Sequence, residues 1–242
     1  MHDFTGKTVL ISGGTGGIGG AVAVAFARAR AHVIATGWGE AELYARRADP
    51  DFGDIEIVSL DVSNEAEIAD LAGRTEQLDV LVNCAGIAAR DDPFAPETFA
   101  RNYDINMIGT LRMCNAFLPQ LEACGTGAII NTASILSFNG SGTSPAYAAA
   151  KGAVVQATKS MAIAWAPKGI RVNAVAPGWI RTAMSAAAVH EPVFVEKVAA
   201  RTPLGGWGEP HHLAGPVLFL ASPDASWVTG AVLPVDGGYL CT

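Results

Sequence analysis

The chain has 242 residues, half of them hydrophobic, which is enough to bury the core of one large α/β domain or two small ones. Its 23 acidic residues outnumber its 16 basic residues, and the formal net charge is −7. This balance argues against nucleic acid or an anionic membrane as the main partner, because both reward clustered Lys and Arg.

The amino terminus, residues 1–7, lacks the basic start, apolar stretch and cleavage site of a secretory signal peptide. No apolar run approaches the ~18 residues that a membrane-spanning helix needs. The four cysteines show no metal-ligand spacing and are interpreted as reduced thiols. We therefore expect a soluble, cytoplasmic protein without a metal site.

Short apolar runs, typical of parallel strands covered on both faces, alternate with longer helical patterns along the chain. The predicted strands are Thr8–Ser12, His32–Thr36, Ile55–Leu60, Val80–Asn83, Ala128–Thr132, Arg171–Ala176 and Val232–Val235. The predicted helices are Gly17–Arg30, Glu40–Ala48, Glu65–Glu76, Glu97–Cys124, Pro145–Pro167 and His211–Ala221. This alternation implies right-handed crossovers, so we predict one α/β domain over residues 1–242, with a doubly wound parallel seven-stranded sheet and helices on both faces.

The segment from Pro177 to Gly208 departs from this pattern. It is weakly periodic and rich in Gly, Pro and Trp. Long segments of this kind are often functional, and we predict a mobile substrate lid around residues 178–208.

A glycine-rich loop, Ser12–Gly19, joins the first strand to the first helix. Its glycines let the backbone turn sharply and let a pyrophosphate approach the helix N-terminus. Glycines also serve ordinary turns, but this position after an N-terminal strand is the one that a dinucleotide site requires. The loop therefore predicts a Rossmann-type fold with cofactor contacts at Gly13, Thr15, Gly16, Gly17, Ile18 and Gly19.

Two polar residues follow or end later strands, at the edge where open α/β sheets bind ligands. Asn83 ends the fourth strand, and Asp61 follows the third. Asp61 can accept a hydrogen bond from an adenine amino group, and it can equally be the N-cap of the next helix.

Tyr147 and Lys151 are four residues apart in a predicted helix, so both project from one face. A free phenol has a pKa near ~10, too high for a base at neutral pH. A nearby ammonium favours the phenolate and lowers that pKa, which makes the tyrosine a usable acid or base. Such a pair also occurs by chance on many helices.

Seven short motifs, in register over nearly the whole chain, resemble those of the short-chain dehydrogenase/reductase family. They are Gly13-x-x-x-Gly17-x-Gly19, Asn83-Cys84-Ala85-Gly86, Asn106, Ser134, Tyr147-x-x-x-Lys151, Pro177-Gly178-Trp179-Ile180-Arg181-Thr182 and Val235-Asp236-Gly237-Gly238. The resemblance implies an NAD(P)-dependent alcohol dehydrogenase or carbonyl reductase, which interconverts a secondary alcohol and a ketone by hydride transfer.

The resemblance also implies the catalytic roles. Tyr147 would be the general acid or base, and Lys151 would lower its pKa and bind the nicotinamide ribose. Ser134 would polarise the substrate oxygen. Asn106 would hold a water that links Lys151 to solvent, and a solvated helix position is its alternative.

The remaining cofactor contacts are likewise implied by the resemblance. They are Gly37, Trp38, Asp61, Val62, Asn83, Ala85, Gly86, Pro177, Gly178, Ile180 and Thr182, together with Tyr147 and Lys151. Asn83 would mainly stabilise the central sheet near the cofactor.

The choice of dinucleotide depends on the residues after the second strand. NAD-preferring relatives commonly carry Asp at the position of Gly37, and NADP-preferring ones often carry Arg at that of Trp38 or a base at that of Gly16. This chain carries none of these charged residues at the three positions. A dianionic phosphate without a cation is poorly compensated, whereas a hydroxyl needs only a modest hydrogen bond, so we predict NAD, with NADP as the alternative.

The substrate pocket is expected to be mainly apolar. The implied substrate contacts are Ser134, Leu136, Tyr147, Trp179 and Met184, and further lining candidates are Ala88, Ala89, Ile135, Val193 and Phe194. An apolar lining favours a hydrophobic or cyclic alcohol or ketone. Arg90 near the mouth could pair with a substrate carboxylate, although a solvated surface arginine is the simpler interpretation, and the same holds for Arg181.

Two other functions are open at this stage. A non-catalytic, nucleotide-sensing regulator of the same fold would be expected to lose part of the Ser–Tyr–Lys set or the glycine loop. A dehalogenase-like lyase would carry Arg in place of Lys151 and bind no nucleotide. The chain keeps Ser134, Tyr147, Lys151 and the glycine-rich loop, which favours the oxidoreductase.

The long predicted helices Glu97–Cys124 and Pro145–Pro167 carry many small or apolar residues. In the family that the chain resembles, the equivalent pair forms a four-helix dimer interface. We therefore expect a homotetramer, with a dimer as the second choice.

Overall fold

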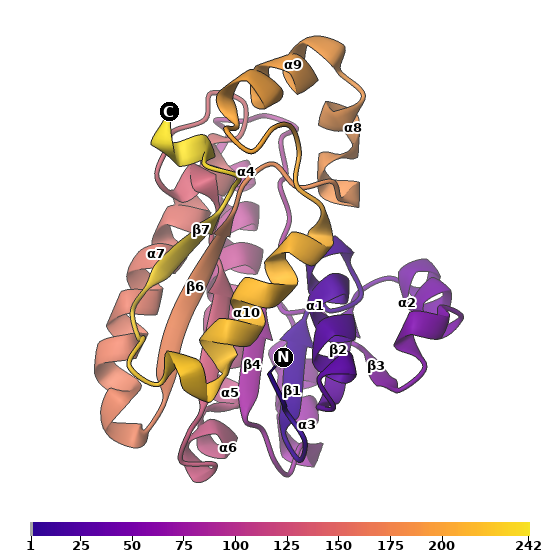
Figure 1. Cartoon of the computed structure of the whole chain (residues 1–242), viewed down its shortest axis with the longest axis vertical. Coiled ribbons are helices and arrows are strands. Elements are labelled where there is room, and N and C mark those ends of the chain that lie inside the picture. Colours follow the sequence, from indigo (N-terminus) through magenta and orange to yellow (C-terminus); the bar gives the residue numbers. More distant parts are fainter. Residues whose placement is uncertain (1) are drawn as a thin grey trace.

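A parallel sheet forms the centre of the computed structural model, which describes residues 2–242 (Figure 1). Its seven strands are β1 Thr8–Ser12, β2 His32–Gly37, β3 Ile55–Ser59, β4 Val80–Asn83, β5 Ala128–Thr132, β6 Arg171–Pro177 and β7 Val232–Val235. Their order across the sheet is β3-β2-β1-β4-β5-β6-β7, and every neighbouring pair is parallel. The doubly wound seven-stranded sheet predicted from the sequence is confirmed. The chain reverses its direction of winding between β1 and β4, the point at which such sheets bind ligands.

The α-helices cover both faces of this sheet (Figure 1). They are α1 Gly17–Arg28, α2 Glu40–Arg47, α3 Glu65–Arg74, α4 Pro96–Tyr103, α5 Gly109–Ala116, α6 Leu118–Ala123, α7 Pro145–Trp165, α8 Ala186–Val189, α9 Pro192–Arg201 and α10 Ala214–Ala221. Among the described residues, no helix combines the length and apolar character needed to cross a membrane.

Strand β1 shows how the sheet acquires two cores. Side chains alternate between the faces of a strand, so Val9 and Ile11 pack in one cluster with Phe26 of α1. Leu10 points the other way, into a second cluster that includes Met113 of α5. All of these side chains are fully buried. The sheet is therefore a rigid layer, and its strand ends are well-fixed points for functional side chains.

The helix predicted over Glu97–Cys124 is interrupted twice in the structure. It contains a π-helical turn at Asp104–Ile108 and breaks at Phe117. Pro119 explains the break, because proline has no N–H and its ring clashes with the carbonyl four residues earlier. The π turn holds Asn106, and single π turns inside helices occur frequently at functional sites.

The weakly periodic segment that was predicted to be a substrate lid contains two helices, α8 and α9, which lie at the carboxyl end of the sheet (Figure 1). Phe194 and Val198 are one turn apart on α9, and Val198 is buried. The Phe194 ring packs edge-on against Trp179, with the centroids 4.8 Å apart, and Trp207 completes the cluster at 5.4 Å from Trp179. These aromatic contacts hold α9 against the chain that leaves β6.

Three buried polar side chains join the sheet to helix α7. Asn83 Nδ2 donates to Asn131 Oδ1 at 3.0 Å, and Asn131 Nδ2 donates to Thr158 Oγ1 at 2.9 Å. Each of these side chains is almost completely buried. A buried amide without hydrogen bonds is unfavourable, so this network fixes α7 relative to β4 and β5. Tyr147 and Lys151 lie on that helix.

Candidate active site

A cavity of about 1020 Å³ extends along the carboxyl ends of the strands, between the glycine-rich loop and the segment of α8 and α9. All four residues with expected catalytic roles line it: Asn106, Ser134, Tyr147 and Lys151. The expected cofactor contacts that line it are Gly13, Gly16, Gly17, Ile18, Gly19, Gly37, Trp38, Asp61, Val62, Ala85, Gly86, Tyr147, Lys151, Pro177, Gly178, Ile180 and Thr182. The expected substrate contacts that line it are Ser134, Leu136, Tyr147, Trp179 and Met184. Residues far apart in the sequence are therefore brought together in one site.

Two of the expected cofactor residues lie behind the cavity wall. Thr15 is fully buried, and its hydroxyl donates a hydrogen bond to Glu42. Asn83 is buried in the network that joins β4 to β5. Both residues support the wall from within the protein and do not line the cavity.

Three candidates for the substrate pocket are also outside the cavity lining. Arg181 Nε lies 3.2 Å from Glu209 Oε1, so its charge is paired on the surface. Val193 is exposed, and the carbonyl of Ala89 accepts a hydrogen bond from Asn102. Arg90 is exposed as expected, and it does line the cavity.

The glycine-rich loop forms a cradle that side chains would fill. Gly13 has a φ of +66°, and a Cβ there would lie 2.7 Å from the backbone nitrogen of Ala85. A Cβ on Gly17 would lie 2.7 Å from the methyl group of Thr182. Gly16, the N-cap of α1, supplies no side-chain hydrogen bond, and the first turn of α1 carries no acidic residue. The free N–H groups at this helix end fit a pyrophosphate, as a dinucleotide requires.

Asp61 forms a turn rather than a helix cap. Its Oδ1 accepts hydrogen bonds from the backbone nitrogen and the hydroxyl of Ser63, at 2.8 and 2.7 Å. The N-cap of α3 is Asn64, whose side chain accepts from two backbone N–H groups of the first turn. The N-cap interpretation of Asp61 was therefore wrong, and its position on the cavity wall leaves the adenine contact as a proposal.

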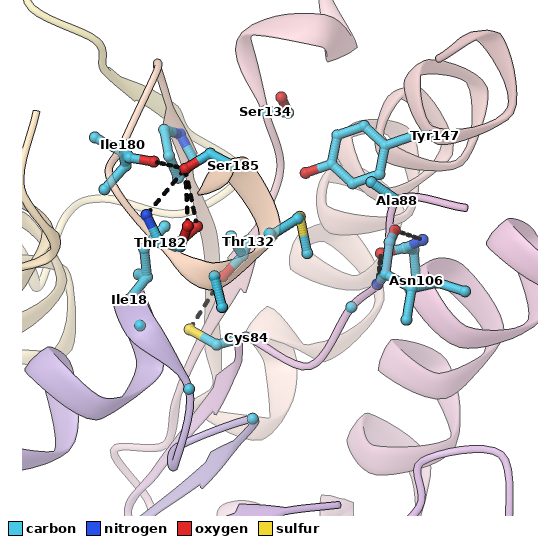
Figure 2. Close-up of a pocket in the computed structure, with 18 of the residues that line it drawn as sticks. Ile18, Cys84, Ala88, Asn106, Thr132, Ser134, Tyr147, Ile180, Thr182 and Ser185 are labelled. Carbon is cyan, nitrogen blue, oxygen red and sulfur yellow. Dashed lines mark hydrogen bonds between the residues drawn. The ribbon is translucent and has the colours of Figure 1, made fainter. Parts of the chain in front are cut away.

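Ser134 lines the cavity. Its Oγ accepts a hydrogen bond from the backbone nitrogen of Leu136 at 3.1 Å, at the start of a 3-10 turn. The hydroxyl can therefore donate to another group. Figure 2 shows the Ser134 and Tyr147 oxygens directed toward the same part of the pocket.

Lys151 is buried beside Tyr147. Its Nζ donates to the carbonyl oxygen of Thr132 at 2.7 Å and lies 5.7 Å from the centroid of the Tyr147 ring. Burial lowers the pKa of Lys151 from 10.5 to about 8. The ammonium thus lies in a poorly solvated position, where its charge acts strongly on its neighbours.

The pKa of Tyr147 differs from the sequence-based expectation. Burial raises the pKa of this phenol, while the Ser134 hydroxyl and the positive charge of Arg90 act in the opposite direction. A lowered value was expected from Lys151, but desolvation of the ring outweighs the favourable contacts. Tyr147 is therefore protonated at neutral pH in this structure.

Asn106 is completely buried, so it is not a solvated helix position. Its Oδ1 accepts from the backbone nitrogen of Ile87 at 3.2 Å, and its Nδ2 donates to the carbonyls of Ile87 and Asn102. A Cβ on Gly86 would lie 2.5 Å from Asn106 Oδ1 and 3.6 Å from Lys151 Nζ. The side chain therefore fixes the chain after β4 beside Lys151. Figure 2 shows the hydrogen bonds of Asn106.

Three further residues of the site had no role in the sequence-based prediction. Glu42, in the first turn of α2, lines the cavity near Gly16. Thr132 provides the carbonyl that holds Lys151. Ser185 donates to the carbonyl of Ile180 at 2.7 Å and so shapes the chain after β6. An acidic residue shortly after β2 was the one available sequence signal for Glu42, and it fits Glu40 equally well.

No group of three or more His, Cys, Asp or Glu side chains within residues 2–242 is arranged to hold a metal ion.

The burial of Lys151 predicts a specific pH dependence of stability. Between pH about 8 and 10.5 the unfolded chain keeps a proton on this lysine that the folded chain has lost. The free energy of unfolding should therefore rise with pH across this window, by about 3 kcal/mol relative to a Lys151→Met variant. Urea denaturation of both proteins at several pH values measures the difference.

Lys159→Met, at an exposed position on the same helix, is the matched control and should show no such trend. A difference between wild type and Lys151→Met that stays constant over this window would contradict a buried, titrating ammonium.

Comparisons with known proteins agree with this geometry. A family model described as enoyl-(acyl carrier protein) reductase matches residues 13–240. A 2-dehydro-3-deoxy-D-gluconate 5-dehydrogenase from Bacillus subtilis is 36% identical over 249 residues, covering 99% of this chain and 98% of the relative. A cis-4-hydroxycyclohexanecarboxylate dehydrogenase from Sinomonas cyclohexanicum is 38% identical over 248 residues, covering 98% of this chain and 97% of the relative.

Among solved structures, a gluconate 5-dehydrogenase from Burkholderia cenocepacia in complex with NADP and tartrate superposes with a TM-score of 0.91. It is 33% identical and covers 99% of this chain, which covers 97% of that structure. The activities named in these relatives are oxidations or reductions, which gives no support to a non-catalytic regulator. The chain belongs to the short-chain dehydrogenase/reductase family and is an NAD(P)-dependent oxidoreductase that acts on secondary alcohols or ketones.

Proposed function

We propose that the protein interconverts a small, carboxylated secondary alcohol and its ketone, with NAD as the preferred cofactor and Tyr147 as general acid or base. The observation that carries the catalytic part is the convergence of Tyr147, Ser134 and Lys151 on one cavity, with Lys151 Nζ 5.7 Å from the centroid of the Tyr147 ring. Ser134 comes from the turn after β5, and Tyr147 and Lys151 come from α7, so only the folded chain brings them together.

Each of the three side chains has a distinct task. Ser134 donates its hydroxyl proton to the substrate oxygen and so orients the reacting carbon. Tyr147 starts protonated and gives its proton to that oxygen in the direction of reduction, or takes it back in the direction of oxidation. Lys151 stabilises the phenolate with its buried positive charge. The nicotinamide, when bound, supplies or accepts the hydride.

Asn106 acts as a positioning residue in this proposal. Its side chain uses its protein partners to hold Ile87, the residue after Gly86, next to Lys151. A water linked to Lys151 on this side of the cavity would let the proton of Tyr147 reach solvent.

Replacing Tyr147 with Phe should lower turnover strongly, because the variant keeps the ring and loses the hydroxyl group that transfers the proton. The expected decrease in kcat is between ~10² and ~10⁴-fold. The Kd of NADH, measured from the change in nicotinamide fluorescence, should stay within about twofold of the wild-type value.

Tyr103→Phe provides the control, since Tyr103 lies on α4 outside the cavity lining. A Tyr147→Phe enzyme that retains wild-type turnover would overturn the proposed role.

The preference for NAD is supported by the charges around the glycine-rich loop. Within the described chain, the cavity-lining residues of this loop, of α2 and of the ends of β2 and β3 include Glu42 and Asp61 but no Lys or Arg. A 2′-phosphate there would meet negative charge without a cationic partner. The gluconate 5-dehydrogenase from Burkholderia cenocepacia was solved with NADP, so the preference proposed here rests on local residues and not on that relative.

A carboxylated substrate is supported by Arg90. This side chain lines the cavity, and no carboxylate of the described residues lies within 4.0 Å of it. Its charge acts on the pKa of Tyr147, so the guanidinium is electrostatically part of the site. The names of the relatives, with gluconate, 2-dehydro-3-deoxy-D-gluconate and hydroxycyclohexanecarboxylate, share a carboxylate and a secondary alcohol or ketone. Leu136, Trp179 and Met184 provide apolar contacts for the remaining carbon skeleton.

Replacing Arg90 with Ala should weaken recognition of a carboxylated alcohol selectively. With cis-4-hydroxycyclohexanecarboxylate as the probe, KM should increase about 10- to 100-fold, because a charge-assisted hydrogen bond is lost. With cyclohexanol, KM should change little. Loss of the positive charge should also move the alkaline limb of the rate profile upward, since Arg90 lowers the pKa of Tyr147.

Arg181→Ala, which removes a surface arginine paired with Glu209, is the control for this experiment. Equal effects of Arg90→Ala on the two alcohols would rule out carboxylate recognition by this residue.

The segment 178–208 is proposed to act as the substrate lid. Met184, Ala187, Ala188 and Phe194 line the cavity from this segment. Closing the segment over a bound substrate would exclude water from the reacting atoms.

We also propose a cytoplasmic homotetramer, with a dimer as the second choice. Ile163 on α7 and Trp227 before β7 are 79% and 99% exposed, which is unusual for side chains of this size. Sedimentation equilibrium should give a mass of four times 25.0 kDa. A mass equal to one chain would contradict both assemblies.

A further inference from the structure

Helix α2 places a carboxylate next to the glycine-rich loop. Glu42 is in the first turn of this helix, at the β3 edge of the sheet, and lines the cavity together with Gly16 and Trp38 (Figure 1). Its Oε1 accepts a hydrogen bond from the hydroxyl of Thr15. The Glu42 side chain is exposed, and among residues 2–242 its other oxygen, Oε2, has no hydrogen-bond partner.

Thr15 determines which residue can end strand β2. A Cβ on Gly37 would lie 2.9 Å from the Cβ of Thr15 and closer still to its hydroxyl. Thr15 is fully buried, and its carbonyl accepts a hydrogen bond from Arg46 Nε at 2.7 Å, so it has no space into which to withdraw. An aspartate therefore cannot occupy position 37, and a carboxylate for the ribose must come from elsewhere in the chain.

Arg46 is a cation in contact with this loop, and two of its three nitrogens donate to protein atoms. Besides the bond to Thr15, its Nη1 donates to Asp49 Oδ2 at 2.9 Å, and the guanidinium stacks over the ring of Phe52 at 4.9 Å. Arg46 does not line the cavity. It is therefore poorly placed to bind a 2′-phosphate.

Glu42 and Arg46 are one helical turn apart, so they hold Thr15 from the same face of α2. One accepts from its hydroxyl and the other donates to its carbonyl. Leu43, which lies between them in the sequence, is fully buried and holds the helix against the rest of the protein. The position of the Glu42 carboxylate is consequently fixed by the loop that would hold the pyrophosphate.

We propose that Glu42 selects the dinucleotide by accepting a hydrogen bond from the adenosine ribose hydroxyl through Oε2 and by repelling a 2′-phosphate. The carboxylate thus does from α2 what an aspartate at the end of β2 does in other NAD-binding proteins. This inference rests on the proposed function, because it takes the glycine-rich loop as the dinucleotide site.

The test compares Glu42→Gln with Glu40→Gln by measuring the Kd of NADH and of NADPH for each protein, without any substrate. Gln keeps an oxygen that can accept from Thr15, so the loop should stay in place, and an unchanged Tm checks this. Glu42→Gln should lower the ratio of the NADPH Kd to the NADH Kd by ~10-fold or more, because a negative charge beside the ribose is removed.

Glu40 is the matched control, because it is the first residue of the same helix, carries the same charge and does not line the cavity. Glu40→Gln should leave the ratio within about twofold of the wild type. An unchanged ratio in Glu42→Gln, or an equal weakening of both dinucleotides, would overturn the inference and leave the proposed function intact. Failure of the wild type to bind either dinucleotide would overturn both.

Discussion

The buried ammonium of Lys151 is the group around which the rest of the site is organised. Removing a charge from water is unfavourable unless hydrogen bonds compensate for the lost solvation. The carbonyl of Thr132 provides one such bond, and it comes from the last residue of β5. The ammonium therefore stays in place only if α7 and β5 keep their relative position. That position is fixed by the buried hydrogen bonds from Asn83 through Asn131 to Thr158.

The same arrangement explains why a raised pKa of Tyr147 is compatible with its proposed role. Burial favours the neutral phenol, so the tyrosine holds the proton that a reduction needs. The phenolate formed after proton transfer would lie close to two positive charges, a buried ammonium and an exposed guanidinium at the cavity mouth. A group that is protonated before the reaction and stabilised as an anion after it is suited to transfer a proton in either direction. The low solvation that raises the pKa also strengthens these interactions.

Much of the fold could be predicted from the sequence, because its determinants are local. Seven apolar runs gave the strands with boundaries within one residue, and the glycine-rich loop lies at the strand-to-helix junction where its glycines are required. The departures have tertiary causes. The π turn at Asp104–Ile108 has no composition signal of its own, and it is accompanied by the contacts of Asn106 with Ile87. Helix α9 is short and weakly patterned, and it is stabilised by Trp179 and Trp207 from outside the helix.

The cofactor end of the site shows why a motif can mislead about selectivity. In the sequence, the glycine at position 37 indicates that the usual aspartate is missing. The prediction of NAD then depends only on which charged residues are absent. In the structure, Gly37 is required because Thr15 occupies the space that a side chain would need. Thr15 in turn carries the hydroxyl that holds Glu42. Selectivity depends on where a charge lies relative to the ribose, and a helix that packs over the loop can place it there as well as a strand can. Gly37, Thr15 and Glu42 therefore form one steric and electrostatic unit, in which a change at any one position alters what the other two can do.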